Sequence, residues 1–268
     1  MIVTEKFIFI HLPKTGGTFV ESCLEELYKK KQKTIFGFSR KQSKDIKYER
    51  VVSQEFMFEG NVIYGQHQGV EQIDRPIDVP IVSVLRDPFE WYASLHNFAW
   101  WKRNPDSTAH KFGGQDIKSY PNLSFGECVD FYKLCAEHTS GFKTEYAIGY
   151  YTWYFISLYF KNPIHVLKNI NEDYIISGAY LKDMYDVEFI NQGDLNMELF
   201  NLLERFGYER KEIDFIVKKN RVLPTGIGRK EGDKAVESIS ECDRLKIMDL
   251  EKMIFHFMDH QMNITKTF

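Results

Sequence analysis

A glycine pair between a short apolar run and an amphipathic stretch constrains the fold of this chain more than any other feature. The run Phe7-Ile8-Phe9-Ile10 has the length of a strand buried on both faces, and residues 18–31 then place their apolar side chains on one helical stripe. Between them lies Pro13-Lys14-Thr15-Gly16-Gly17-Thr18. Two adjacent glycines let the backbone turn tightly and approach a neighbour or a ligand closely. The segment therefore predicts a strand over Lys6–Leu12, a tight turn and a helix.

Two threonines offer a start for this helix. Thr18 with Glu21 three residues later matches a capping box, and Thr15 is the alternative start.

Short apolar runs and amphipathic stretches alternate along the rest of the chain. Further strands are expected at Thr34–Phe38, Asn61–Gly65, Pro80–Leu85 and Tyr185–Asn191. Further helices are expected at Pro88–Lys102, Phe125–His138, Tyr146–Phe160, Asp194–Phe206 and Ser240–His260. This alternation predicts a three-layer α/β fold, with a mainly parallel central sheet, helices on both faces and a P-loop-like phosphate-binding loop after the first strand. No linker divides the chain, so residues 1–268 are predicted to form a single domain.

Charge and hydropathy exclude some classes of partner. A net charge of −3 argues against a protein that coats nucleic acid or an anionic membrane, so an anionic ligand must be held by local groups. No window approaches the ~18 apolar residues of a membrane span, and no secretory signal opens the chain. The four cysteines have neither metal-site nor C-x-x-C spacing. We therefore expect a soluble, cytoplasmic protein with free thiols and no bound metal.

The glycine loop has the chemistry of a phosphate site. Lys14 adds a positive charge, Thr15 and Thr18 add hydroxyls, and the following helix start adds unpaired N–H groups and a positive dipole end. A plain strand-to-helix turn is the alternative. The P-loop of nucleotide triphosphatases differs, because its lysine follows the second glycine, whereas Lys14 precedes both.

A second motif follows the strand predicted at Pro80–Leu85. Asp87 and Pro88 suit the N-cap and the first position of a helix. Arg86 stands at the carboxyl end of the strand, where open α/β sheets bind ligands, and Ser94 lies two helical turns beyond Asp87 on the same face. Arg86 and Ser94 could therefore clamp a further phosphate. An arginine paired with a nearby carboxylate and a merely buried serine are the alternative.

The two motifs together resemble the sulfotransferase family that uses 3′-phosphoadenosine 5′-phosphosulfate (PAPS). The form H-x-P-K-T-G-G-T at His11–Thr18 is similar to the branch that includes carbohydrate sulfotransferases, and R-D-P…S at Arg86–Ser94 follows in the family's order and spacing. A weaker likeness extends over Glu188–Phe206. The resemblance implies transfer of a sulfuryl group from PAPS, the co-substrate, to a hydroxyl of a small-molecule or glycan acceptor, with a carbohydrate favoured.

The resemblance also implies a role for each motif residue. The loop residues Thr15, Gly16, Gly17 and Thr18 would hold the 5′-phosphate, and Lys14 would stabilise the charge that develops on the leaving oxygen.

Arg86 and Ser94 would hold the 3′-phosphate. A late basic loop, residues 226–232, would add Arg229 and Lys230, although Glu231 interrupts the family's usual run and an exposed loop without a ligand is the alternative.

A hydroxyl acceptor needs a base, and a neutral histidine can serve near pH 7. His67 follows the strand predicted at Asn61–Gly65, at the expected ligand edge of the sheet, and family members often place their base after this strand. A histidine on a surface loop is the alternative. His11 is a rival base, but its closeness to the glycine loop favours a role in shaping that loop.

Two other functions fit parts of the pattern. An ATP-dependent small-molecule kinase would use Asp87 as a magnesium ligand, and a nucleotide-binding module would lack the base. Trp91, Tyr92, Leu95 and Phe98 have helical spacing typical of a core, although one or two could wall an acceptor site. The sequence does not predict an oligomeric state.

Overall fold

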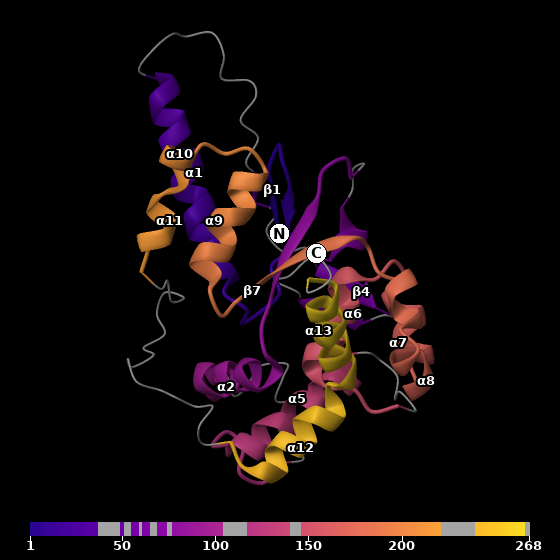
Figure 1. Ribbon diagram of the computed structural model, residues 1–268. Coiled ribbons are helices and arrows are strands. Elements are labelled where there is room, and N and C mark those ends of the chain that lie inside the picture. The colour runs from indigo at the N-terminus through magenta and orange to yellow at the C-terminus, as the bar shows by residue number, and fades with distance from the viewer. Residues whose placement is uncertain are drawn as a thin grey trace. The chain divides into compact units, whose positions relative to one another are not determined.

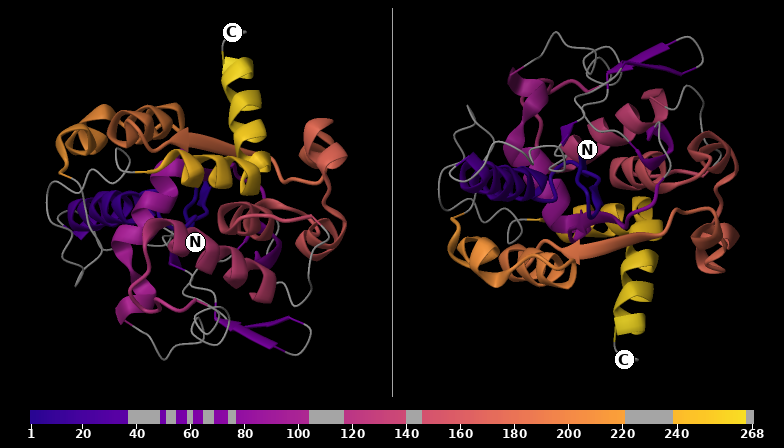
Figure 2. Two further views of the ribbon diagram at one scale, coloured as in Figure 1. Left: turned by 90° about the horizontal axis from the view of Figure 1, so that it is seen from below. Right: turned by 90° about the horizontal axis from the view of Figure 1, so that it is seen from above.

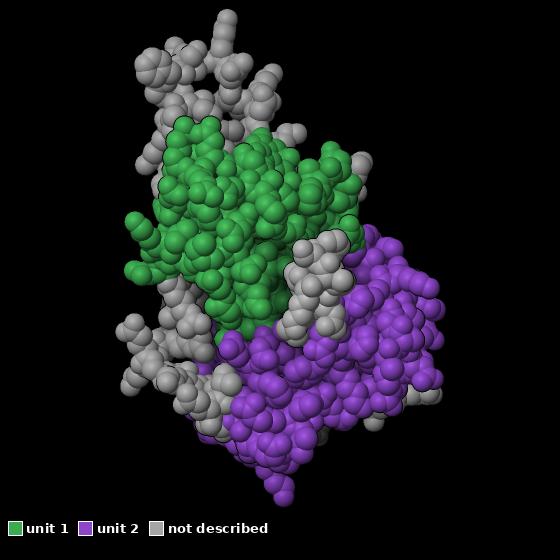
Figure 3. Space-filling view, in the orientation of Figure 1, with its two compact units in different colours: residues 1–53, 66–86, 186–228 green, residues 54–65, 87–185, 229–268 purple. Residues whose placement is uncertain are grey.

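The computed structural model describes residues 1–36, 49–50, 55–58, 61–64, 69–73, 77–103, 117–139, 146–220 and 239–265 (Figure 1). The chain divides into two compact units, each assembled from separate parts of the sequence (Figure 3). Unit 1 comprises Met1–Ser53, Gln66–Arg86 and Asp186–Gly228, and unit 2 comprises Gln54–Gly65, Asp87–Tyr185 and Arg229–Phe268.

Unit 1 is built around a mixed sheet with the strand order β3-β1-β2-β6-β7. These strands are β1 (Ile2–Val3), β2 (Ile8–Phe9), β3 (Glu49–Arg50), β6 (Ile81–Leu85) and β7 (Val187–Asn191). β2, β6 and β7 are parallel to one another, whereas β1 runs antiparallel to both β2 and β3. The chain is therefore α/β, as predicted, but with a mixed sheet. The antiparallel part begins with β1, which the sequence analysis did not predict.

Helices of unit 1 bury one face of this sheet. They are α1 (Gly17–Phe36), α9 (Leu195–Arg205), α10 (Arg210–Ile213) and α11 (Phe215–Lys218). The short 3₁₀ helix η1 (Val70–Gln72) also belongs to unit 1. α1 and α9 to α11 lie side by side in all three views (Figures 1 and 2). Phe9 of β2, Val82 and Val84 of β6, and Phe7 just before β2 share one buried cluster with the apolar stripes of α1 and α9. Each such side chain contributes ~1.5–3 kcal/mol by burial.

Unit 2 is mainly helical. Its helices are α2 (Pro88–Phe98), α3 (Trp100–Arg103), α5 (Phe125–Thr139), α6 (Tyr150–Tyr159), α7 (Pro163–Asn169), α8 (Glu172–Ile176), the 3₁₀ helix η3 (Ala179–Lys182), α12 (Glu241–Leu250) and α13 (Lys252–Thr265). A two-stranded antiparallel sheet, β4 (Glu55–Phe58) and β5 (Asn61–Tyr64), also belongs to it. Trp91 stacks on Tyr151 with 4.6 Å between ring centroids, and Trp91, Tyr92 and Leu95 are buried core residues, as predicted.

Local sequence signals locate most of these elements. The Asp87 carboxylate accepts a hydrogen bond from the Glu90 N–H at 3.1 Å, and Pro88 opens α2 as predicted. Six expected elements are confirmed within a few residues: the strands at 61–65, 80–85 and 185–191 and the helices at 125–138, 146–160 and 194–206.

Three expectations about helix continuity are wrong. Residues 34–36, expected as a strand, continue α1. The helix expected over 88–102 breaks at Ala99, whose φ of 43° is left-handed. The helix expected over 240–260 breaks at Glu251 into α12 and α13.

Glu251, at the break between α12 and α13, has a buried carboxylate that binds the first residues of α6. Glu251 is fully buried and accepts hydrogen bonds from the Tyr92 hydroxyl (2.6 Å), the Tyr151 N–H (3.1 Å), and the N–H and hydroxyl of Thr152 (2.7 and 2.6 Å). A Cβ on Gly149 would lie 1.9 Å from its Oε1, so this position requires glycine. The carboxylate thus satisfies two of the unpaired N–H groups of the helix.

Glu251 should make the stability of unit 2 depend on pH. Burial raises its pKa from 4.5 to about 7, although its hydrogen bonds oppose this shift. The folded chain therefore binds this proton more tightly than the unfolded chain. Its contribution to stability is complete below about pH 4.5 and lost as pH rises through 7, a change of about 3 kcal/mol.

Urea unfolding from pH 4.5 to 8 should show this loss in the wild type. Glu251→Gln cannot titrate and should carry only a constant penalty. If the difference in unfolding free energy between the two proteins does not change with pH, Glu251 is not the titrating group.

Candidate functional site

The carboxyl ends of the three parallel strands meet at one edge of the unit 1 sheet. Phe9 pairs with Val82, and Leu85 pairs with Asn191, so the residues that follow β2, β6 and β7 emerge at the same edge. Those residues are the glycine loop, Arg86 and Gln192. Ligands of open α/β sheets bind at this edge.

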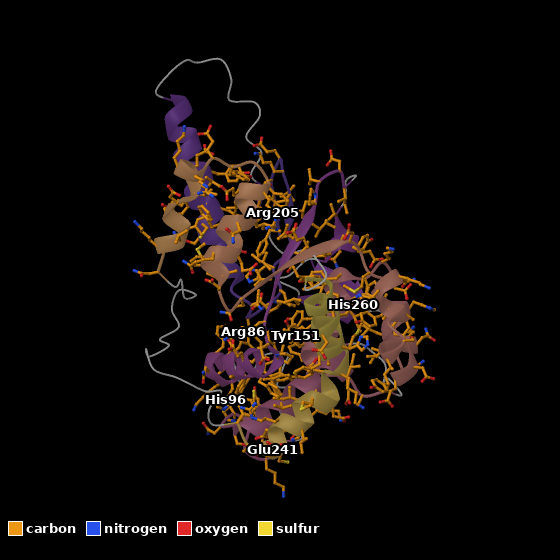
Figure 4. The ribbon with its side chains drawn as sticks, in the orientation of Figure 1. Arg86, His96, Tyr151, Arg205, Glu241 and His260 are labelled. Atoms are coloured by element: carbon orange, nitrogen blue, oxygen red, sulfur yellow. The ribbon has the colours of Figure 1, made fainter. Side chains whose placement is uncertain are left out.

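The glycine loop is held by hydrogen bonds to its own backbone. The Thr15 hydroxyl, fully buried, donates to the Leu12 carbonyl at 2.8 Å. Lys14 has a φ of 66°, which is uncommon for a residue other than glycine, and its carbonyl accepts a hydrogen bond from Arg86 Nη1 at 3.0 Å. The Thr15 hydroxyl proton therefore stabilises the turn, and the guanidinium of Arg86, which is labelled in Figure 4, donates to it.

Both glycines are required by the geometry. Gly16 has a φ of 100°, and a Cβ there would lie 2.6 Å from Leu195 at the start of α9. A Cβ on Gly17 would lie 2.1 Å from the His11 ring. The turn is thus packed between two neighbours that leave no space for a side chain.

The loop presents backbone N–H groups that have no internal acceptor. The Gly16 carbonyl accepts from the N–H groups of Phe19 and Val20 at the start of α1. Gly17 and Thr18 are the first two residues of α1, so their N–H groups have no acceptor within the helix. Several N–H groups at the start of a 20-residue helix, next to the side chain of Lys14, form a suitable environment for an anion.

The predicted capping box is not formed, because α1 begins at Gly17 and places Thr18 inside its first turn. The Glu21 carboxylate instead lies 3.0 Å from His11 Nδ1. The expectation that His11 shapes the loop agrees with this contact and with its ring against Gly17.

The predicted Arg86–Ser94 pair is divided between the two units. Arg86, 8% exposed, closes unit 1, and Ser94, 5% exposed, lies on α2 of unit 2. Burial of Ser94 is also what the alternative, a merely buried serine, expects, and the joint contact of the two residues with a phosphate stays a prediction.

Three predicted site residues, His67, Arg229 and Lys230, lie outside the described residues. One premise for His67 is wrong: β5 pairs with β4 in a separate two-stranded sheet and does not belong to the central sheet. Two further residues near Gly16 were not predicted from the sequence: Gln192, which directly follows β7, and Leu195, the first residue of α9. For Gln192, the position directly after a predicted strand was the available signal.

The three comparisons with known proteins gave no match, whether made against protein-family models, curated protein sequences or solved structures. In the part of the chain that the structure describes, no helix is long and apolar enough to cross a membrane. The same residues contain no cluster of three potential metal ligands. All four cysteines are free.

Replacing Gly17 by alanine should destabilise the protein through His11. The added methyl group overlaps the imidazole, at an expected cost of about 1–3 kcal/mol, although alanine alone favours helix by up to ~1 kcal/mol. In a His11→Ala background the overlap is removed, so the same substitution should be neutral or stabilising.

Urea unfolding of the four proteins in this double-mutant cycle gives the coupling energy. Gly193→Ala, at an exposed glycine whose added Cβ would be 3.4 Å from the nearest atom, is the control. Equal effects of Gly17→Ala in both backgrounds would contradict the packing argument.

Proposed function

We propose that this protein is a sulfotransferase that moves a sulfuryl group from PAPS to a hydroxyl of an organic acceptor. The observation that carries the proposal is the loop after β2, where the first N–H groups of α1 lie beside two glycines whose neighbours, Leu195 and His11, leave no room for a side chain. The order of the two sequence motifs then favours PAPS over other phosphate ligands. In this proposal the sheet is the centre of a three-layer fold, and the loop is P-loop-like.

Each loop group has a distinct task in the proposed reaction. The N–H groups of residues 15–18 bind the 5′-phosphate, each charge-assisted hydrogen bond contributing ~1.5–3 kcal/mol. Lys14 stabilises the negative charge on the phosphate oxygen as its bond to sulfur breaks. Arg86 and Ser94 bind the 3′-phosphate, with Arg229 and Lys230 as further contacts.

Proton transfer completes the reaction. His67 accepts the hydroxyl proton of the acceptor while the hydroxyl oxygen forms its bond to sulfur. The products are the sulfated acceptor and adenosine 3′,5′-bisphosphate. The resemblance to carbohydrate sulfotransferases favours a sugar hydroxyl as the acceptor, and transfer of labelled sulfate from PAPS to a panel of sugars and other alcohols tests this.

Binding measurements test the cofactor assignment and Arg86 together. Isothermal titration calorimetry should show adenosine 3′,5′-bisphosphate binding more tightly than adenosine 5′-monophosphate, and Arg86→Ala should reduce this preference by about 10- to 150-fold, the equivalent of a lost contact of ~1.5–3 kcal/mol. Arg205→Ala removes an equal charge from an exposed side chain of unit 1 and is the control (Figure 4).

Preferential binding of ATP with Mg²⁺ would favour the kinase interpretation instead. Unchanged discrimination in Arg86→Ala would remove this residue from the 3′-phosphate site.

His67→Ala should lower the transfer rate by ~10²- to 10⁴-fold while leaving the affinity for adenosine 3′,5′-bisphosphate nearly unchanged, because a general base contacts the acceptor. His165→Ala, at an exposed histidine on α7, is the matched control. Normal turnover without His67 would assign the base elsewhere. A joint loss of turnover and affinity would indicate a structural role.

A further inference from the structure

Four aromatic side chains of unit 2 gather where α5 and α6 lie side by side (Figure 1). Tyr150 of α6 stacks on Trp153, with 5.5 Å between ring centroids and 10° between ring planes. It also stacks on Tyr132 of α5, at 4.9 Å and 22°. Tyr154 meets the Trp153 ring edge-on, with 4.9 Å between centroids. We call this group, Tyr132, Tyr150, Trp153 and Tyr154, the α6 aromatic cluster.

The indole of Trp153 differs from the other buried indole of unit 2 whose partner is known. Trp153 is 9% exposed, and its Nε1–H is buried without a hydrogen-bond partner among the described residues. The Nε1–H of Trp101, which is also buried, donates to the Pro121 carbonyl at 3.0 Å. A buried indole N–H normally has such a partner, because an unpaired donor has lost its hydrogen bond to water. An acceptor from another molecule would satisfy the Trp153 donor.

Two of the rings that contact Trp153 also reach the surface. Tyr150 and Tyr154 are half-buried, and their spacing of four residues places them on the same side of α6. The Tyr150 hydroxyl donates to the Tyr154 hydroxyl at 3.4 Å, longer than the ~2.5–3.0 Å that is usual for such a bond. Loss of so long a contact costs little free energy. Because solvent-facing side chains change rotamer within nanoseconds, a ligand oxygen can replace this contact and reach the neighbouring indole.

The polar groups of the cluster select the chemistry of a ligand. Burial raises the pKa of Tyr150 and of Tyr154, so both phenols keep their protons and the surroundings disfavour a charge. The Trp153 N–H and, once its long contact is broken, the Tyr150 O–H are two donors that need an acceptor. A carbonyl oxygen has two lone pairs and brings no proton of its own. A sugar would instead bring several hydroxyls, whose hydrogen bonds these few polar groups cannot supply.

We propose that the α6 aromatic cluster is a binding site for an uncharged planar ring that has a carbonyl oxygen. The oxygen accepts hydrogen bonds from Trp153 Nε1–H and from the Tyr150 hydroxyl. The ring packs against the half-buried side chains of Tyr150 and Tyr154. No bond of the ligand changes. This inference goes beyond the proposed function and does not depend on it, because the cluster belongs to unit 2 and the glycine loop to unit 1.

Three small molecules with the same ring system test the role of the oxygen. They are 1-indanone, which has the carbonyl, 1-indanol, which has a hydroxyl in its place, and indane, which has neither. In protein with ¹⁵N-labelled tryptophan, 1-indanone should shift the indole N–H signal of Trp153 downfield as the hydrogen bond forms. The affinity for 1-indanone should exceed that for indane by about 10-fold, with 1-indanol between them. Trp153→Phe identifies the signal by its loss.

Two variants separate the donors from the rings. Trp153→Phe and Tyr150→Phe each keep an aromatic ring and remove one donor, so each should weaken 1-indanone binding by about 3- to 10-fold and leave indane binding nearly unchanged. Trp100→Phe, at a tryptophan of α3 that is 39% exposed, is the control and should change neither affinity. The ¹H signals of the ligand give the affinity of each variant, including the one without the indole.

Three results would overturn this site. The first is a Trp153 signal that 1-indanone leaves in place, and the second is equal binding of 1-indanone and indane. The third is a shift produced by glucose and not by 1-indanone, which would indicate a sugar site. None of these results bears on the binding of adenosine 3′,5′-bisphosphate to the wild type and Arg86→Ala, so the two proposals fail independently.

Discussion

The close packing of the backbone at Gly16 and Gly17 is the constraint on which the rest of the candidate site depends. Leu195 and the His11 ring fill the space that a side chain would need at these two positions. The turn is thereby fixed between the end of β2 and the start of α9, with its N–H groups at one edge of the sheet. A larger residue at either glycine would displace the start of α1 and, with it, the donors that an anion requires.

A comparison of two helix starts in the same chain shows why the loop suggests an external ligand. α6 is supplied with an internal anion, since the Glu251 carboxylate accepts from the N–H groups of Tyr151 and Thr152. α1 has no equivalent acceptor among the described residues at its first N–H groups. The start of α6 is thus satisfied by a buried carboxylate, although burial of that group costs free energy. The start of α1 has no such internal group and lies at the edge where α/β sheets bind ligands. This contrast, and not the glycine pair alone, supports a binding role for the loop.

The sequence was most informative where the structure depends on local interactions. Asp87 and Pro88 define the start of α2 through a cap and a fixed φ, and the apolar run at β6 is buried along its whole length. It was least informative where distant contacts decide. The break at Glu251 depends on Tyr92 and Thr152, and the pairing of β5 with β4 depends on a strand that was not expected. The close contact of Leu195 with Gly16 could likewise not be foreseen, because it joins residues about 180 positions apart.

The failure of the capping-box prediction has a direct chemical consequence. In a capping box, the carboxylate at the third helical position accepts a hydrogen bond from the backbone N–H of the cap residue. Glu21 would then have satisfied Thr18, and one of the donors at the loop would have been lost. Because α1 begins at Gly17, two residues earlier than this cap would place it, Glu21 contacts His11 and the Thr18 N–H, in the first turn of the helix, has no acceptor within the helix. The same carboxylate that would have closed the site thus becomes the group that fixes the imidazole behind it.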